Sequence, residues 1–448
     1  MKISFYGATG GVTGSNYLIE TDKGKVIVDC GLFQGDKDES ILNWKEFTYN
    51  PAEVDAVIMT HSHIDHIGRV PLLVKKGFKG TIYSTEPTKE FAGIFLADSC
   101  HLMENEAEYM NQEPLYDLDD VTKTIDLVET HTYHKKFSPI EGMEVEFFDA
   151  GHILGSAIVK ITSGGKTVIF SGDLGNPPVP LLKATEQIDS ADLVIMESTY
   201  GDRIHKPVDE RKGELIEIIK DALKDNGTIL MPSFAMERTQ EILYELNHLA
   251  DNNEIPLIPV YLDSPLAIKA TEIYKKFPKY FNQEATDLLK TGDDFFAFKG
   301  LKMVDESADS MKLDKDEAAK IIIAGSGMSN GGRIQWHEKA FLPKESTRLL
   351  IVGYQVKGTL GRRLLDGEKE LKIRGAEVFS KAKVIPIESY SAHADQPKLL
   401  KWVSAIKDVQ KIILVHGEDE SKKVLAEKIK EVSGANVEIP AADQIIEV

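Results

Sequence analysis

The feature that most constrains this chain is a cluster of metal-ligand side chains within six consecutive residues. His61, His63, Asp65 and His66 follow the continuous apolar run Val54–Thr60, which has the pattern of a strand buried on both faces. A turn at the end of such a strand can aim several side chains at one point, and zinc favours imidazole and carboxylate ligands. The cluster therefore predicts a metal site rather than an ordinary polar loop.

Further candidate ligands share this placement at the end of an apolar, strand-like run. They are His152, Asp173, Glu197 and His416. Ligands in sheets of this kind gather outside the carboxyl ends of the strands. One polar residue at a strand end is explained by turn formation, but several with this placement indicate one shared site.

The number of candidates suggests two metal ions. One set of three is His61, His63 and His152, and the other is Asp65, His66 and His416. Asp173 would be shared by both sets. Asp173 suits the shared position because a carboxylate has two oxygens. Two ions about 3.5–4 Å apart lower the pKa of a shared water and stabilise the oxygens of an in-line displacement. Such a centre can hydrolyse phosphodiesters, but also lactams, thioesters and lactones.

The 448 residues suggest two or three domains. Residues 1–204 and 381–448 have the pattern of short strands with helices, and the acidic segment 87–134 is expected to be helical. Residues 205–380 alternate strand and helix, as a parallel α/β layer does. We therefore expect an α/β fold in which one β-rich domain, 1–204 with 381–448, carries an inserted α/β domain.

A glycine-rich segment near the N-terminus, Gly7–Gly14, superficially matches a dinucleotide-binding turn. That site needs a helix directly after the glycines, and the strand-like run Asn16–Glu20 follows instead. We expect either a bulged loop between strands or a loop that floors a nearby site.

The motif H-S-H-I-D-H, together with Asp29, His152 and Asp173, resembles the metallo-β-lactamase superfamily. The resemblance implies an αββα sandwich and a metal-dependent hydrolase. It also implies that Asp29 supports a ligand and that Asp65 is both a ligand and a catalytic residue.

Three later motifs resemble the β-CASP nucleases, the branch that includes ribonuclease J and the nuclease subunit of the cleavage and polyadenylation factor. These are E-S-T-Y-G at Glu197, S-A-H-A-D at His393 and V-H-G-E at His416. The insertion at 205–380 lies where the β-CASP domain belongs. In this family a histidine at the third motif is associated with RNA substrates.

The resemblance implies a ribonuclease for RNA processing or decay, which cleaves RNA with a di-zinc-activated water in a cleft between the domains. His393 would protonate the leaving oxygen or contact the scissile phosphate, and Glu197 would orient it. Two zinc ions are the expected cofactor, with manganese or iron as alternatives.

The inserted domain supplies candidate RNA-binding residues. Its glycine-rich loop after Lys320–Ala324 can bring backbone N–H groups close to phosphate oxygens. In P-S-F-A-M-E-R, which resembles another β-CASP segment, Phe234 could stack on a base, although core packing is an equally good interpretation. The candidates are Ser233, Phe234, Arg238, Ser326, Ser329, Asn330, Gly331, Gly332 and Arg333.

Two other functions compete with this one. A thioesterase or lactonase on the same fold would explain the ligands but not the insertion, His393 or the glycine-rich loop. An inactive RNA-binding subunit would have lost ligands, and none is missing. The remaining histidines are expected to be structural: His101, His131, His134, His205, His248 and His337.

The net charge of −19 seems to argue against a polyanionic substrate. However, residues 98–149 alone hold 14 acidic and 3 basic side chains, whereas 355–384 hold 8 basic and 4 acidic ones. We expect RNA to follow the second stretch, which includes Lys357, Arg362, Arg363, Lys372 and Arg374.

The two cysteines, Cys30 and Cys100, exclude a disulfide framework and a cysteine zinc site. No run approaches the ~20 apolar residues that span a bilayer, and the N-terminal pattern is not that of a signal peptide. We therefore expect a cytoplasmic enzyme without a membrane partner. Whether it forms a homodimer is left open.

Overall fold

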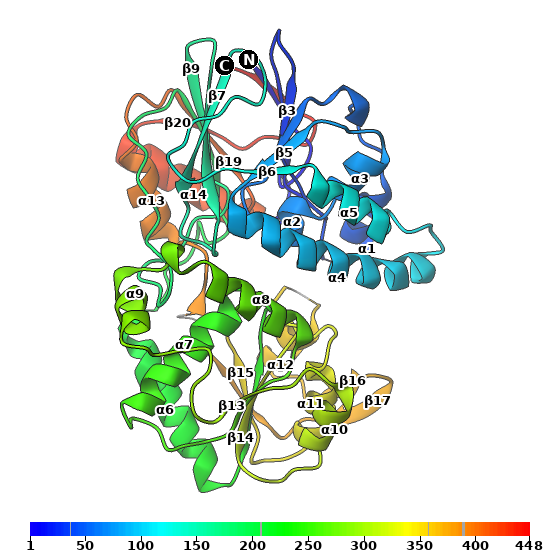
Figure 1. Cartoon of the computed structure of the whole chain (residues 1–448), viewed down its shortest axis with the longest axis vertical. Coiled ribbons are helices and arrows are strands. Elements are labelled where there is room, and N and C mark those ends of the chain that lie inside the picture. The colour runs from blue at the N-terminus through cyan, green and yellow to red at the C-terminus, as the bar shows by residue number, and fades with distance from the viewer. Residues whose placement is uncertain (36, 207, 357, 388–389) are drawn as a thin grey trace. The chain divides into compact units, whose positions relative to one another are not determined.

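The computed structural model describes the chain except residues 36, 207, 357 and 388–389 (Figure 1). The chain divides into two compact units. The first is Met1–Pro177, Leu182–Ile204 and His393–Val448, and the second is Pro178–Leu181 and His205–Ala392. The first unit is thus built from both ends of the sequence.

The first unit contains two sheets. One has the order β21 (Ile445–Glu447), β1 (Lys2–Phe5), β2 (Asn16–Glu20), β3 (Lys25–Cys30), β4 (Ala56–Ile58), β5 (Thr81–Ser84) and β6 (Val128–Thr130). The other has the order β20 (Asn436–Glu438), β19 (Lys411–Val415), β10 (Leu193–Glu197), β9 (Lys166–Phe170), β8 (Ala157–Ser163) and β7 (Met143–Asp149).

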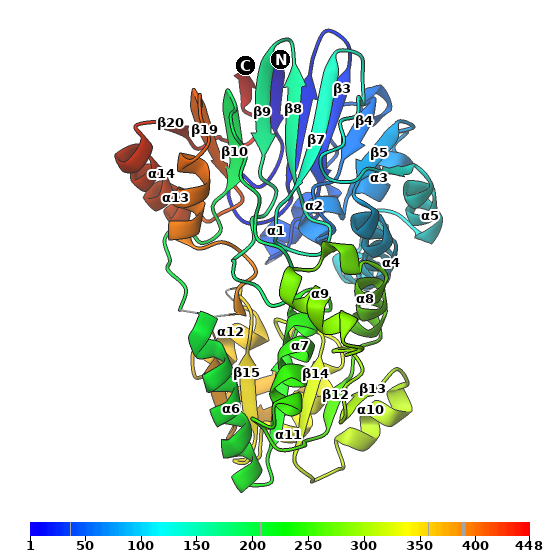
Figure 2. The ribbon, with the colours of Figure 1, turned by 60° about the vertical axis from the view of Figure 1, so that its left-hand side comes forward.

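Side chains that alternate along each strand are buried on both faces of these sheets. Val28 and Phe147 belong to the core between the two sheets, whereas Ile27, next to Val28, packs against the helices outside. The outer face of the first sheet is covered by α2 (Ile64–Ile67), α3 (Val70–Lys75), α4 (Glu86–Met110) and α5 (Leu118–Asp126). The second sheet is covered by α13 (Gln396–Ser404) and α14 (Asp419–Ser433). Figure 2 shows the resulting four layers, which confirm the expected αββα sandwich.

The second unit is built on one parallel sheet, as the alternation of strand and helix predicted. Its order is β13 (Leu301–Met303), β12 (Val260–Leu262), β14 (Lys320–Ala324), β11 (Thr228–Pro232), β15 (Arg348–Ile351) and β18 (Lys383–Pro386). A separate hairpin joins β16 (Glu370–Ile373) to β17 (Ala376–Phe379).

The helices of the second unit are α6 (Val208–Lys224), α7 (Arg238–Asp251), α8 (Pro265–Lys276), α9 (Gln283–Lys290), α10 (Ser307–Leu313), α11 (Ile334–Phe341) and α12 (Leu360–Leu365). Shorter turns are α1 (Lys37–Ser40), η1 (Ile41–Trp44), η2 (Pro51–Glu53) and η3 (Pro278–Tyr280). In the described part of the chain, no helix combines the length and the apolar character that crossing a membrane requires.

Two expectations need correction. The segment 87–134 is helical only in part, because β6 pairs with β5 and adds a strand to the edge of the first sheet. The second unit extends beyond residue 380, to Ala392, because β18 pairs with β15 in its sheet.

Candidate metal centre

The predicted ligands meet at one end of the two sheets of the first unit. β9, β10 and β19 are parallel neighbours, so their carboxyl ends lie side by side. Asp173 follows β9, Glu197 ends β10 and His416 follows β19. The 61–66 segment follows β4 and His152 follows β7, which brings the remaining ligands to the same place.

Three histidines and one oxygen of Asp173 form a first set. His63 Nδ1 lies 3.1 Å from His61 Nε2 and 3.2 Å from His152 Nε2. Asp173 Oδ2 lies 3.5 Å from His61 Nε2 and 3.6 Å from His152 Nε2. Ligand atoms at about 2.0–2.1 Å from a tetrahedral ion would be about 3.3 Å apart. The four atoms are therefore spaced to hold one cation.

The other oxygen of Asp173 faces a second set, which contains Asp65, His66 and His416. Asp173 Oδ1 lies 3.3 Å from His66 Nε2 and 3.7 Å from His416 Nε2. His416 Nε2 lies 3.3 Å from Asp65 Oδ2. Asp173 thus stands between two ligand sets with one oxygen toward each, as a bridging carboxylate would.

Two atoms of the second set fit a cation particularly well. His66 Nε2 and Asp173 Oδ1 are buried and have no hydrogen-bond partner among the described residues. A buried polar atom without a partner costs roughly 1–3 kcal/mol. A cation between these two atoms would remove that cost.

The ionisation of the first ligand set suits a cation. Burial lowers the pKa of His61 and His152, and it lowers the pKa of His63 to about 3, so these imidazoles are neutral. Burial acts to raise the pKa of Asp173, but the surrounding histidines, His416 most strongly, lower it well below its usual range. Neutral imidazoles and a charged carboxylate are the states that metal binding requires. In the second set, burial acts to lower the pKa of His66, but the carboxylates of Asp173 and Asp29 raise it well above its usual value, so His66 would release a proton on binding a cation.

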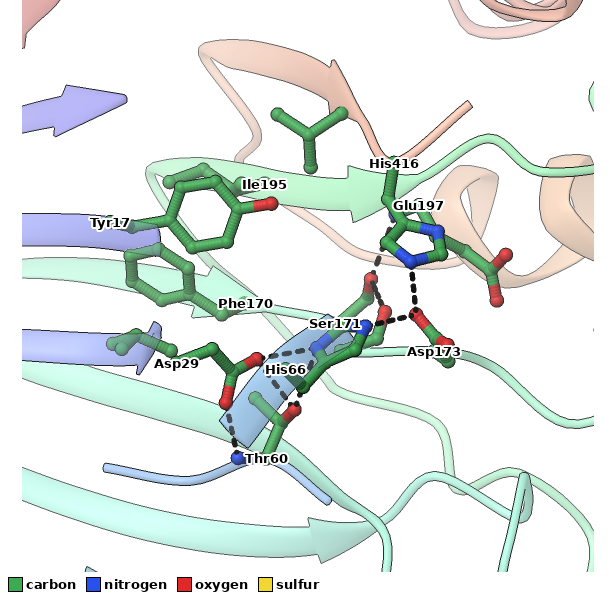
Figure 3. A pocket seen from close by; sticks show the side chains of 13 residues that line it. Tyr17, Asp29, Thr60, His66, Phe170, Ser171, Asp173, Ile195, Glu197 and His416 are labelled. Atoms are coloured by element: carbon green, nitrogen blue, oxygen red, sulfur yellow. Dashed lines mark hydrogen bonds and ion pairs between the residues drawn. The ribbon is translucent and has the colours of Figure 1, made fainter. Parts of the chain in front are cut away.

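Asp29 holds His66 from behind. Its Oδ2 lies 2.7 Å from His66 Nδ1 and accepts a 2.7 Å hydrogen bond from Thr60 Oγ1, while its Oδ1 accepts one from the Thr60 backbone N–H at 2.8 Å. Figure 3 shows His66 with one ring nitrogen toward Asp29 and the other toward Asp173. Thr60 has no signal in the sequence other than its position directly before His61.

His393 lies beside both ligand sets. Its Nδ1 is 3.1 Å from Glu197 Oε2 and 3.8 Å from Asp173 Oδ2, and a backbone bridge to Gly175 holds its position. The second oxygen of Glu197 accepts the backbone N–H of Leu174. The side chain of His393 is 22% exposed, so it can reach a bound ligand.

The protonation of His393 follows from these neighbours. Burial lowers its pKa, but the carboxylates of Glu197 and Asp173 outweigh burial and raise the pKa to about 9. A protonated imidazole next to the two ligand sets can donate a proton.

The glycine-rich loop Gly7–Gly14 lies against the metal centre. This agrees with the second interpretation of the loop, that it lines a nearby site. The carbonyl oxygen of Ala8 accepts the backbone N–H of His416 at 2.7 Å. Lys422, fully buried at the start of α14, donates to the carbonyl of Thr9 and fixes the loop from the other side. No sequence pattern had indicated Lys422.

In the second unit, some candidate RNA-binding residues remain accessible. Phe234 is 40% exposed, so core packing does not explain it. A Cβ atom at Gly327 would lie 2.7 Å from its ring, so the ring keeps this position only next to a glycine. The other candidates that stay exposed or half-buried are Ser326, Asn330, Gly331 and Gly332. Ser233 is buried and accepts a hydrogen bond from Thr239 Oγ1.

Arg238 and Ser329 are buried, as Ser233 is, whereas Arg333 is half-buried; a role of these residues in binding RNA stays a prediction. Arg238 is buried in an ion pair with Glu241. Ser329 is fully buried. Arg333 donates to Asp263 Oδ1 at 2.6 Å and to two backbone carbonyls. Their hydrogen bonds hold the loops of the second unit in place.

Three family models match the chain. A metallo-beta-lactamase superfamily domain matches residues 18–194, a Beta-Casp domain matches 239–364, and a Zn-dependent metallo-hydrolase RNA specificity domain matches 380–440. Together they follow the order of the motifs along the sequence.

Several curated proteins are similar along most of the chain. Ribonuclease TTHA0252 of Thermus thermophilus is 36% identical, over 97% of this chain and 98% of the relative. An RNase J-like protein of Methanocaldococcus jannaschii is 31% identical, over 93% of this chain and 92% of the relative. Transcription termination factor FttA of the same organism is 30% identical, over 98% of this chain and 70% of the relative.

A solved structure shares the fold. It is a protein of unknown function from Enterococcus faecalis V583, with a TM-score of 0.56 and 12% sequence identity, and the match covers 99% of both chains.

Proposed function

This chain belongs to the Beta-Casp branch of the metallo-beta-lactamase superfamily, and on that premise we propose that it is a metal-dependent ribonuclease that hydrolyses RNA phosphodiester bonds. The RNA specificity domain and the ribonuclease and RNase J-like names of its relatives support an RNA substrate. The observation that carries the proposal is the position of Asp173 between two ligand sets.

The proposed cofactor is a pair of zinc ions, with manganese as the alternative. His61, His63 and His152 would hold one ion, Asp65, His66 and His416 the other, and Asp173 both. Bound zinc would supply Lewis-acid polarisation of a phosphate oxygen and a nucleophilic water at neutral pH.

The chain's own residues would perform the proton transfer. His393 donates a proton to the leaving oxygen of the RNA, because it is protonated and partly exposed beside the ligands. Glu197 holds Nδ1 of His393 and so fixes the orientation of the imidazole beside the ligands. Asp29 fixes His66 in the same way.

The second unit would bind RNA through its accessible groups. Backbone N–H groups at Gly331 and Gly332 suit phosphate oxygens, and the exposed ring of Phe234 suits a base. A cytoplasmic location and a role in processing or decay remain predictions from the sequence.

The test is cleavage of end-labelled single-stranded RNA, carrying a 5′-monophosphate or a 5′-triphosphate, by the purified protein. We expect cleavage by the native chain and by His101→Ala, a matched histidine outside the centre, but none by His63→Ala or Asp173→Ala. Circular dichroism would establish that these variants are folded. Full activity in either ligand variant contradicts the mechanism. Turnover of a thioester without RNA cleavage would favour the alternative hydrolase.

A further inference from the structure

The basic stretch 355–384 does not offer all its charges to a ligand. Arg362 pairs with Asp366 at 3.0 Å and Arg363 pairs with Glu368 at 2.5 Å. Lys381 and Lys383 also have carboxylate partners, and Lys357 lies outside the described residues. These pairs neutralise the arginines that the sequence had favoured as the RNA path.

Among the described residues of 355–384, the basic side chains without an ion pair are Lys369, Lys372 and Arg374. Lys372 lies on β16, and Arg374 lies in the turn between β16 and β17. Glu377 stands opposite Lys372, but no ion pair joins them. The cations of this stretch that have no ion pair thus lie on or next to the β16–β17 hairpin, which also carries Glu370 and Glu377.

The guanidinium group of Arg374 lies against an exposed aromatic ring. Its guanidinium carbon lies 4.3 Å from the ring centroid of Trp336 on α11, and the Lys339 ammonium lies 5.7 Å from the same centroid. Trp336 remains 46% exposed, although tryptophan is usually well buried. Figure 1 shows α11 beside β16 and β17.

The same arginine ties this ring to the glycine-rich loop. Arg374 Nη2 donates to the carbonyl oxygen of Gly332 at 3.1 Å. An exposed indole with unpaired cations, joined to a loop suited to phosphates, has the chemistry that single-stranded nucleic acid requires.

We propose that Trp336 and Arg374, with Lys339 and Lys372, form a second contact surface for single-stranded RNA, separate from the metal centre. The proposal rests on the proposed function, since it names where that substrate binds. The open part of the indole stacks on a base, and the three cations neutralise the phosphates on either side.

The test is fluorescence anisotropy with a labelled single-stranded RNA of about 12 nucleotides. The parent protein for this test is the full, metal-loaded chain with the substitution His393→Ala. This substitution suppresses RNA cleavage and changes no proposed metal ligand. We expect Trp336→Ala to weaken binding about tenfold and Trp336→Phe to retain most of it. Arg374→Gln should lower the slope of affinity against salt by about one. Phe379→Ala, on the same hairpin and 51% exposed, is the matched control and should bind as the parent does.

Tryptophan emission gives a second readout. The chain has three tryptophans, and Trp402 is only 6% exposed. RNA should quench the emission of the parent, and Trp336→Phe should lose that quenching. Unchanged RNA affinity in Trp336→Ala would contradict the proposed contact surface but not the proposed ribonuclease function. RNA binding through Trp336 in a native chain that cleaves no RNA would instead support the surface and overturn the proposed function.

Discussion

Asp29 Oδ2 lies 2.7 Å from His66 Nδ1, and this contact keeps His66 Nε2 directed at Asp173. The carboxylate is buried behind the ligand that it orients, so it can act on metal binding without touching the metal.

Asp29→Asn should therefore weaken metal binding by about 10–100-fold while the chain stays folded, because the amide supports a basic imidazole less well. Competition with a coloured chelator would measure the change. Asp22→Asn, whose side chain is 84% exposed, is the matched control. Native affinity in Asp29→Asn would show that the contact does not support the ligand.

His393→Ala should reduce kcat for RNA cleavage by about 10²–10⁴-fold and leave the bound metal unchanged, because His393 donates a proton but completes neither ligand set. Glu197→Gln should lower kcat as well and shift the pH profile, since it removes the charge that keeps His393 protonated. Single-turnover kinetics and metal analysis would check both. Loss of metal in His393→Ala would mean that the side chain is a ligand.

Gly327→Ala should raise the KM for RNA by about 5–10-fold with little change in kcat, because its Cβ would lie 2.7 Å from the ring of Phe234 and would displace it. Gly213→Ala, where a Cβ atom meets nothing within 4 Å, is the control. Steady-state kinetics would separate KM from kcat. An unchanged KM would indicate that Phe234 does not bind RNA.

Asp149→Asn should raise Tm at pH 8 by a few degrees and leave it nearly unchanged at pH 4. Burial, with the carboxylate of Glu186 nearby, raises the pKa of Asp149 from its ordinary 3.8 to about 7. Between these values the folded chain keeps a proton that the unfolded chain has lost, so stability falls as pH rises through this window. The amide oxygen can still accept the backbone N–H of Gly151, as Asp149 Oδ1 does at 2.9 Å. Thermal unfolding at both pH values, with exposed Asp126→Asn as control, would check the sign.

The family and the fold could be predicted from the sequence, and both are confirmed. The histidine cluster at 61–66 is local, and strand-end placement is visible as an apolar run followed by a polar residue. Parallel strands carry their carboxyl ends to one edge, so the meeting of Asp173, Glu197 and His416 follows from the pattern.

Side-chain direction could not be predicted in the same way. Arg238 and Arg333 have the charge of RNA-binding residues, yet they pair with the buried carboxylates of Glu241 and Asp263. Those partners are specified by packing, and a charge is bound by whichever opposite charge lies nearest in space. Trp336 and Arg374 are in contact because the β16–β17 hairpin packs beside α11, which the sequence does not show.

The amino-acid pattern thus specified which residue types gather and at which strand ends, because those depend on local periodicity and on the common direction of parallel strands. Tertiary structure decided which atom faces which: the two oxygens of Asp173, the ring nitrogens of His66, and the partners of each arginine. These choices depend on contacts between residues far apart in the chain, which no local pattern of the sequence contains.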